Sequence, residues 1–563
     1  MGGKGIVLPK TILFMKLRKR IPPSQLIDDA GVLVRPGWLL AGLCLAGAAK
    51  AFEPSFEIFY PPSAAPFGAG WSLARFLASS WAVILVLFML AGGTLGDMVG
   101  RRKVLLWGLG IMVFTNILLL LSPNTLWHVL WRIPANISTG LILPLTLAPL
   151  YIFFDGRQRV IAFAVYIITI GSVGLLSDHL GRLITQSLDW RNVYFLPGLI
   201  AITAFFLVRR SLPESRTVNP RLIDTILYSS WTILLLGIIY AILELALGRE
   251  WILSVFIIVS VVIAVGLGTL IWWARHTRGG LNRNTTLHSR HVIVLIVCGV
   301  ILQIALVGFF LLTYGFYRVA QNKDLAQSLL SLAPIFIGML VALLLITRLW
   351  AQQEVKRVIG TGFLLLALVI SGMALVSRFP SWLHLLPLGI FGIAIIITKT
   401  VWTNAFFQTL IDRYIGLNAG INSATLLVGG ALGAVLATEL LGFFGQSAFV
   451  RNFDSTSLSE RAVLSLYEDI TTTIAAGEQA GIKNLALTIG TNLYSQYQNA
   501  YNIAYSLAIM IIAVLCLLAA ILIFRGIRAS LLFKPETAPL DDPTSTISEA
   551  EDELVQVIKS PQD

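Results

Sequence analysis

Long apolar runs, separated by short polar or charged segments, recur along almost the whole chain. Fourteen of them approach the roughly 20 residues that a membrane-crossing helix needs. The first six are centred near residues 50, 86, 113, 139, 171 and 200, and two more cover 223–247 and 251–273. The last six are centred near residues 304, 338, 367, 394, 429 and 513. The pattern predicts an all-α integral membrane protein with about 14 transmembrane helices.

Composition supports this class and excludes others. Hydrophobic residues make up 56% of the 563 positions and charged residues only 12%, against about a quarter in soluble domains. The net charge of +12 reflects basic membrane loops rather than nucleic-acid binding. Cys44, Cys298 and Cys516 all fall in predicted spans, so we expect neither a disulfide framework nor a metal site, and no cofactor is indicated.

Basic residues are distributed unevenly between the two sides of the predicted helices. With alternating spans, 28 of the 41 Lys and Arg residues fall on the side that holds both termini. The positive-inside rule therefore predicts cytoplasmic termini and an even number of spans. The expected location is the cell membrane, inner or plasma, with the lipid bilayer as the surroundings of the chain.

The same pattern divides the chain into five parts. Residues 1–35 form a cytoplasmic N-terminal segment, 36–210 a first six-helix bundle, and 211–290 two linking helices with their loops. Residues 291–533 form a second six-helix bundle, in which the polar segment 444–499 is an extracytoplasmic loop with helical stretches. Residues 534–563 hold eight of the 29 acids and are expected to be a disordered cytoplasmic tail.

A charged turn between the second and third apolar runs is the most diagnostic motif. It reads GTLGDMVGRRK from Gly93 to Lys103 and resembles the loop between helices 2 and 3 of the major facilitator superfamily. The matching positions include Gly93, Asp97, Gly100, Arg101 and Arg102. The resemblance implies two six-helix bundles and a conformational gate at this loop, whereas a cytoplasmic turn that merely obeys the positive-inside rule is the alternative.

Further positions point to one branch of that family. Fourteen helices are typical of its drug:proton antiporters, which have two extra helices between the bundles. Arg132 matches the buried arginine of helix 4 in that branch, and Asp189-Trp190-Arg191 resembles the entry to its helix 6. Helix 5 departs from the branch, because Asp178 stands where its Gly-Pro antiporter signature has proline. This departure leaves the direction of transport open.

Lys50, Glu53 and Glu57 are spaced i, i+3 and i+7, which places them on one face of a helix. Three charges facing lipid would together cost about 8–10 kcal/mol on insertion scales, so lining a watery pathway is the more favourable position. There Lys50 could hold one glutamate ionised while the other takes up a proton. Alternatively, the first helix ends near Phe52, before both glutamates, as the helix-breaking Pro54 would favour.

The remaining candidates are single charged residues in apolar helices. Arg132 would contact cargo or couple protons, with Glu53 or Asp178 as its partner. Asp178 and His179 form either a surface charge cluster or a gate with a proton-relay histidine. Lys399 is either an anchor near a helix end or a residue of the transport pathway.

No Walker A pattern occurs in the sequence, so an ion gradient is the expected energy source. The favoured function is a proton-coupled secondary transporter that exports a small amphipathic molecule or metabolite by alternating access. Its expected partners are cargo and protons, joined by a periplasmic adaptor protein if the cell has two membranes. The alternatives are a proton symporter that imports a solute and a non-transporting receptor or scaffold. No nucleophile–base pair is apparent, so an enzyme is not expected.

Overall fold

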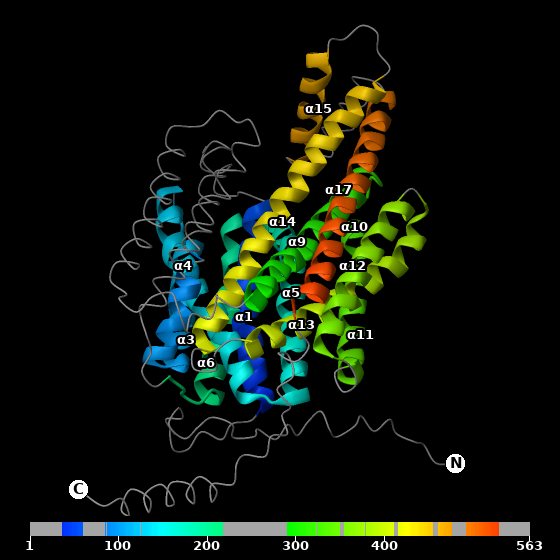
Figure 1. Ribbon diagram of the computed structural model, residues 1–563. Coiled ribbons are helices and arrows are strands. Elements are labelled where there is room, and N and C mark those ends of the chain that lie inside the picture. The colour runs from blue at the N-terminus through cyan, green and yellow to red at the C-terminus, as the bar shows by residue number, and fades with distance from the viewer. Residues whose placement is uncertain are drawn as a thin grey trace, which may run out of the picture.

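The computed structural model describes residues 36–59, 85, 87–123, 125–217, 290–323, 325–349, 354–377, 379–409, 415–453, 460–475 and 491–527. All regular elements in these ranges are helices, which confirms the all-α prediction. They form two bundles that lie side by side (Figure 1).

The described part of the N-terminal bundle contains six helices and one short 3-10 turn. They are α1 (Pro36–Phe59), the helix Leu87–Val99, α3 (Arg101–Leu120), α4 (Thr125–Phe153), α5 (Gly156–Ser187), η3 (Trp190–Tyr194) and α6 (Phe195–Ser211). Within the bundle, α1 packs against α4, α5 and α6, and α3 packs against α4 and α6.

The C-terminal bundle repeats this arrangement with longer helices. It comprises α9 (Arg290–Val319), α10 (Leu325–Ser331), α11 (Ala333–Leu349), α12 (Val355–Val376), η5 (Ser381–His384), α13 (Leu385–Thr409), α14 (Ile415–Asn452), α15 (Glu460–Ala475) and α17 (Thr491–Gly526). Helix α14 packs against α4 of the other bundle, and α13 packs against α5.

Ten helices in the described part of the chain are long and apolar enough to cross a membrane, and Pro36–Phe52 and Leu87–Val99 are shorter apolar helices. The two linking spans expected at 223–247 and 251–273 lie outside the described residues, as do the N-terminal segment and the acidic tail. Large apolar side chains on the bundle surface are exposed, for example Leu368 (69%) and Leu375 (75%), as expected for lipid-facing positions.

The segment 444–499 begins and ends as a continuation of two core helices. Helix α14 has 38 residues, about 57 Å at 1.5 Å per residue, which exceeds a hydrocarbon core of about 30 Å. Together with α15 and the start of α17 it projects beyond the other helices at the top of Figure 1. Tyr467 of α15 packs between Phe449 of α14 and Tyr497 of α17, which joins the three projecting helices.

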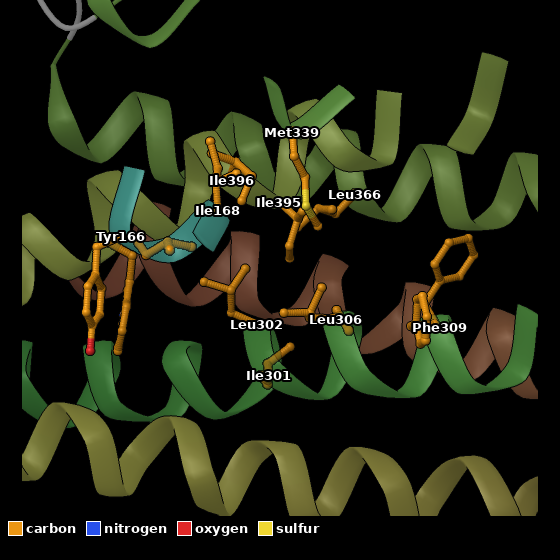
Figure 2. Close-up of a cluster of buried hydrophobic side chains, with 14 of the residues drawn as sticks. Tyr166, Ile168, Ile301, Leu302, Leu306, Phe309, Met339, Leu366, Ile395 and Ile396 are labelled. Carbon is orange, nitrogen blue, oxygen red and sulfur yellow. The ribbon is translucent and has the colours of Figure 1, made fainter. Parts of the chain in front are cut away.

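The interior of the C-terminal bundle is a continuous apolar core. Figure 2 shows part of it, with side chains from α9 facing those of α11, α12 and α13. The labelled residues of these helices are Ile301, Leu302, Leu306, Phe309, Met339, Leu366, Ile395 and Ile396, and the labelled Tyr166 and Ile168 belong to α5 of the N-terminal bundle. Small residues bring the backbones close where α11 meets α13: a Cβ on Gly338 would lie 2.1 Å from the carbonyl oxygen of Gly389.

Replacing Gly338 by alanine should destabilise the bundle, because the new methyl group would force α11 and α13 apart. We expect a loss of about 1–3 kcal/mol, typical of overpacking, measured as a lower midpoint of thermal unfolding of the purified protein. Gly442→Ala in α14 is the matched control, since a Cβ at Gly442 meets nothing within 4 Å. Equal stability of the two variants would contradict close packing at Gly338.

Candidate functional site

The charged motif forms the junction between the helix Leu87–Val99 and α3. Gly100 makes the turn with a φ of +128°, a backbone conformation that side chains disfavour. A Cβ on Gly100 would also lie 2.6 Å from a carboxylate oxygen of Glu214. The turn therefore needs glycine, and it places Asp97 and Arg101 one helical turn apart on either side of it.

Asp97 and Arg101 form a buried ion pair, with each side chain 1% exposed. Arg101 donates from Nη2 and Nε to the same oxygen, Asp97 Oδ1, over 2.6 and 3.0 Å. Because the pair is buried, removing either partner would leave an unpaired charge inside the protein, which is strongly destabilising.

The Asp97 carboxylate also binds the other bundle. Its Oδ1 accepts a hydrogen bond from the backbone N–H of Gly416 (2.9 Å), and its Oδ2 accepts one from Leu417 (3.1 Å). Both N–H groups belong to the first turn of α14, where the helix dipole favours a negative charge. Asp97 thus caps a helix of the C-terminal bundle while it remains paired within the N-terminal bundle. We call these contacts of Asp97 the latch, and the end of the bundles that carries them the Asp97 end.

Two glycines let the backbones come close enough for the latch. A Cβ on Gly93 would lie 2.1 Å from the carbonyl oxygen of Gly416, and a Cβ on Gly416 would lie 2.3 Å from that of Gly93. The glycine at position 93 of the motif is therefore a contact between the two bundles.

The segment after α6 completes the surroundings of the motif. Arg101 donates to the hydroxyls of Ser215 (3.3 Å) and Thr217 (3.1 Å). The Glu214 carboxylate accepts hydrogen bonds from the backbone N–H groups of Arg102 (3.1 Å) and Lys103 (3.2 Å), so it caps the start of α3. The sequence analysis did not predict Glu214, Ser215 and Thr217, although Glu214 is visible as an acid in an otherwise basic loop.

Arg102 lies on the outer side of the motif. Its guanidinium donates to the carbonyl oxygen of Arg209 at the end of α6, over 2.7 Å. The five motif positions predicted from the sequence are thus brought together, with Gly93 and Asp97 at the bundle interface and Arg102 against α6.

Arg132 lies in α4 near the opposite end of the N-terminal bundle and is 1% exposed. Its guanidinium carbon is 5.9 Å from the centre of the Tyr194 ring, and the Tyr194 hydroxyl lies 3.4 Å from Nε2 of His128. These three buried side chains form a cluster where η3 meets α4. His128 was not predicted, although its spacing of four residues from Arg132 put it on the same helix face.

Lys50 is 4% exposed and lies in α1 among helices of its own bundle. Helix α1 continues past Phe52 and Pro54 to Phe59, so Glu53 and Glu57 belong to the helix, contrary to the alternative in which it ends near Phe52. Asp178 and His179 lie in the second half of α5. The side chains of these four residues lie outside the described part of the structure, and their contacts with Lys50 and Arg132 stay predictions.

Among the described residues, no three His, Cys, Asp or Glu side chains come together as a metal site would require. The chemistry available to the described site is therefore that of ion pairs, helix ends and hydrogen bonds between two bundles.

Comparison with known proteins identifies relatives of this architecture. The family model of the Major Facilitator Superfamily matches residues 38–437. The multidrug transporter protein MdtP of Bacillus subtilis is 21% identical over 336 residues, which cover 58% of this chain and 61% of that relative. The multidrug resistance protein B homolog of Mycobacterium tuberculosis is 20% identical over 459 residues, 79% of this chain and 82% of that relative. The crystal structure of the human organic anion transporter MFSD10 (TETRAN) superposes with a TM-score of 0.52 at 14% identity, covering 86% of this chain and 98% of that one.

Replacing Asp97 by asparagine should open the Asp97 end more often. Asparagine keeps the shape but loses the charge, and hydrogen bonds to charged groups contribute about 1.5–3 kcal/mol against about 1 kcal/mol for neutral ones. The measurement is the rate at which N-ethylmaleimide labels Ser423→Cys in a chain whose three native cysteines are replaced by alanine. Ser423 is 6% exposed and lies on the same face of α14 as Gly416 and Gly420.

We expect labelling to be about tenfold faster in Asp97→Asn, which corresponds to roughly 1.4 kcal/mol. The matched control is Asp155→Asn, because Asp155 pairs with Arg159 over 2.9 Å within the N-terminal bundle. If the two variants are labelled at the same rate, the latch does not hold this end closed.

Proposed function

Because the chain belongs to the Major Facilitator Superfamily, we propose that it exports a small amphipathic molecule or metabolite in exchange for protons. Membership of this family makes the chain a multi-pass membrane protein and a secondary transporter, not an enzyme. The coupling ion, the direction and the residues that carry protons are the proposed part.

The latch is the observation that carries the mechanism. Asp97 binds Arg101 in one bundle and the N-terminus of α14 in the other, so opening of the Asp97 end must break the contacts to Gly416 and Leu417. A contact between rigid bundles that can form and break is what alternating access requires.

The proposed direction rests on the curated relatives. Both the Bacillus and the Mycobacterium proteins carry multidrug names, as a transporter and as a resistance protein. From these names we propose for this chain that the cargo leaves the cell and is an amphipathic compound.

Proton coupling is assigned to the charged residues in the helices of the N-terminal bundle. Lys50 and Arg132 are buried, and α1 carries Glu53 and Glu57 in the helix that contains Lys50. A carboxylate beside a buried base can take up and release a proton as its surroundings change between the two open states. Asp178 and His179 of α5 are the second proposed proton pathway.

The proposed orientation puts the Asp97 end and both termini in the cytoplasm of a cell with this protein in its plasma or inner membrane. It follows from the excess of Lys and Arg on that side of the helices. The projecting helices α14, α15 and α17 then face outward, where a periplasmic adaptor could bind in a cell with two membranes.

Import by proton symport is the second candidate function. It is favoured by Asp178, which stands where the antiporter signature has proline. The two directions make opposite predictions, because an antiporter moves cargo against the proton flow and a symporter moves it along the proton flow.

The test is dye flux into proteoliposomes with an imposed pH gradient, with rhodamine 6G as a cationic probe, Nile red as a neutral one and 11-(dansylamino)undecanoate as an anionic one. Exchange predicts uptake when the vesicle lumen is acidic, in whichever orientation the protein inserts. Protein-free vesicles correct for passive distribution. Uptake only with acid outside would establish symport, and no flux of any probe would favour a scaffold.

Glu53→Gln, Glu57→Gln and Arg132→Ala should each reduce gradient-driven flux about tenfold or more, in line with the contribution of a proton-transfer group. Glu354→Gln is the matched control, since Glu354 pairs with the exposed Arg357 at the start of α12. If all three variants show the same flux as the parent, these residues do not form the proton-coupling site.

A further inference from the structure

Lys399 places a positive charge at mid-depth in the C-terminal bundle. It lies in α13, about 21 Å from the first residue of the helix and about 15 Å from the last at 1.5 Å per residue. A charged side chain at such a depth costs about 2.5–3.5 kcal/mol on insertion scales, so it is uncommon without a function.

Among the described residues, Lys399 has no acidic partner for its charge. Its Nζ donates a hydrogen bond to Oε1 of Gln303 in α9, over 2.8 Å. None of the ion pairs between described residues includes Lys399. The ammonium group is therefore held in place by a neutral amide, which orients it and leaves its charge uncompensated.

Lys399 and Gln303 lie where α9, α13 and α14 meet, and both are only partly buried. Gln303 packs against Gly430 of α14, where a Cβ would lie 3.6 Å from its side chain. Helices α13 and α14 both pack against the N-terminal bundle, and α9 contacts both of them. The lysine is thus carried by a helix that packs against the other bundle.

Beyond Lys399, α13 carries more polar side chains toward the Asp97 end. Thr400, Thr403 and Asn404 share a helix face with Phe407, which stacks on Tyr151 and Phe163 of the N-terminal bundle at 5.0 and 5.8 Å between ring centres.

Asn404 is 1% exposed, and neither its amide nitrogen nor its amide oxygen hydrogen-bonds a protein group in the described structure. The Thr403 hydroxyl is also buried and has no hydrogen-bond partner in the described structure. Buried polar groups of this kind cost about 1–3 kcal/mol each unless they find a partner. They favour a ligand that brings hydrogen-bonding atoms to the interface between the bundles.

We propose that the cargo is an amphipathic organic acid whose carboxylate binds the ammonium group of Lys399. Other polar atoms of the cargo bond to Asn404 and Thr403, while its apolar part lies among the apolar side chains of the two bundles. This inference rests on the proposed transport function and names its substrate class. An anionic group at Lys399 compensates the charge for which the described protein groups supply no counter-ion, which a cationic cargo cannot do.

The test is equilibrium binding without a gradient, to the full chain in lipid nanodiscs. The probes are 11-(dansylamino)undecanoate and its methyl ester, which share the fluorophore and the chain and differ in one negative charge. Empty nanodiscs supply the background. We expect the parent to bind the acid roughly tenfold or more tightly than the ester, the effect of one hydrogen-bonded charge pair. Equal affinities for the two probes would overturn the proposal without any variant.

Lys399→Gln should lower the affinity for the acid to that for the ester and leave the ester unchanged, whereas Lys399→Arg should keep the preference for the acid. Lys356→Gln, in the first turn of α12, is the matched control that removes one lysine charge elsewhere and should bind as the parent does. A preference for the acid that persists in Lys399→Gln would overturn the proposal, as would its loss in Lys356→Gln. If the protein prefers the acid but no probe crosses the membrane of the proteoliposomes, the proposed transport function is rejected and the proposed anion site at Lys399 is supported.

Discussion

One carboxylate joins the two halves of this molecule. Asp97 is buried, and its charge is compensated from two directions, by the Arg101 guanidinium in its own bundle and by the first N–H groups of α14 in the other. In a medium that screens charge poorly, neither partner can leave without a replacement. The surrounding structure serves this contact: Gly93 and Gly416 let the backbones approach, and Ser215 and Thr217 accept two further hydrogen bonds from Arg101.

The same electrostatic constraint distinguishes the two kinds of buried charge in the structure. At the Asp97 end the acid and the base satisfy each other, so the contact can hold a closed state without cargo. Lys399 lies at mid-depth with only a neutral amide as its described partner. A compensated pair suits a gate, and an uncompensated charge suits recognition of a ligand that supplies the opposite sign.

The sequence predicted local features well and distant contacts poorly. Hydrophobic runs indicated the helices because a bilayer requires long apolar segments with internally bonded backbones. The motif indicated Asp97 and Arg101 because the two residues are one helical turn apart. Their partners Gly416, Ser215 and Thr217 are brought near by tertiary packing, which no local pattern encodes. Likewise, Lys399 was visible as a charge in an apolar helix, but its contact with Gln303 depends on how α9 and α13 pack.

Helix α14 connects the gate to the cargo site that we propose. Its first turn binds Asp97, and Gly430, about 21 Å further along at 1.5 Å per residue, packs against Gln303. Helix α14 is continuous from Ile415 to Asn452 and contains no proline, one of the usual causes of a sharp kink. We expect release of the latch to shift the helix surface against which Gln303, the partner of Lys399, is packed. A single continuous helix thus contacts both sites, which gives cargo a physical route by which to influence which end of the protein is open.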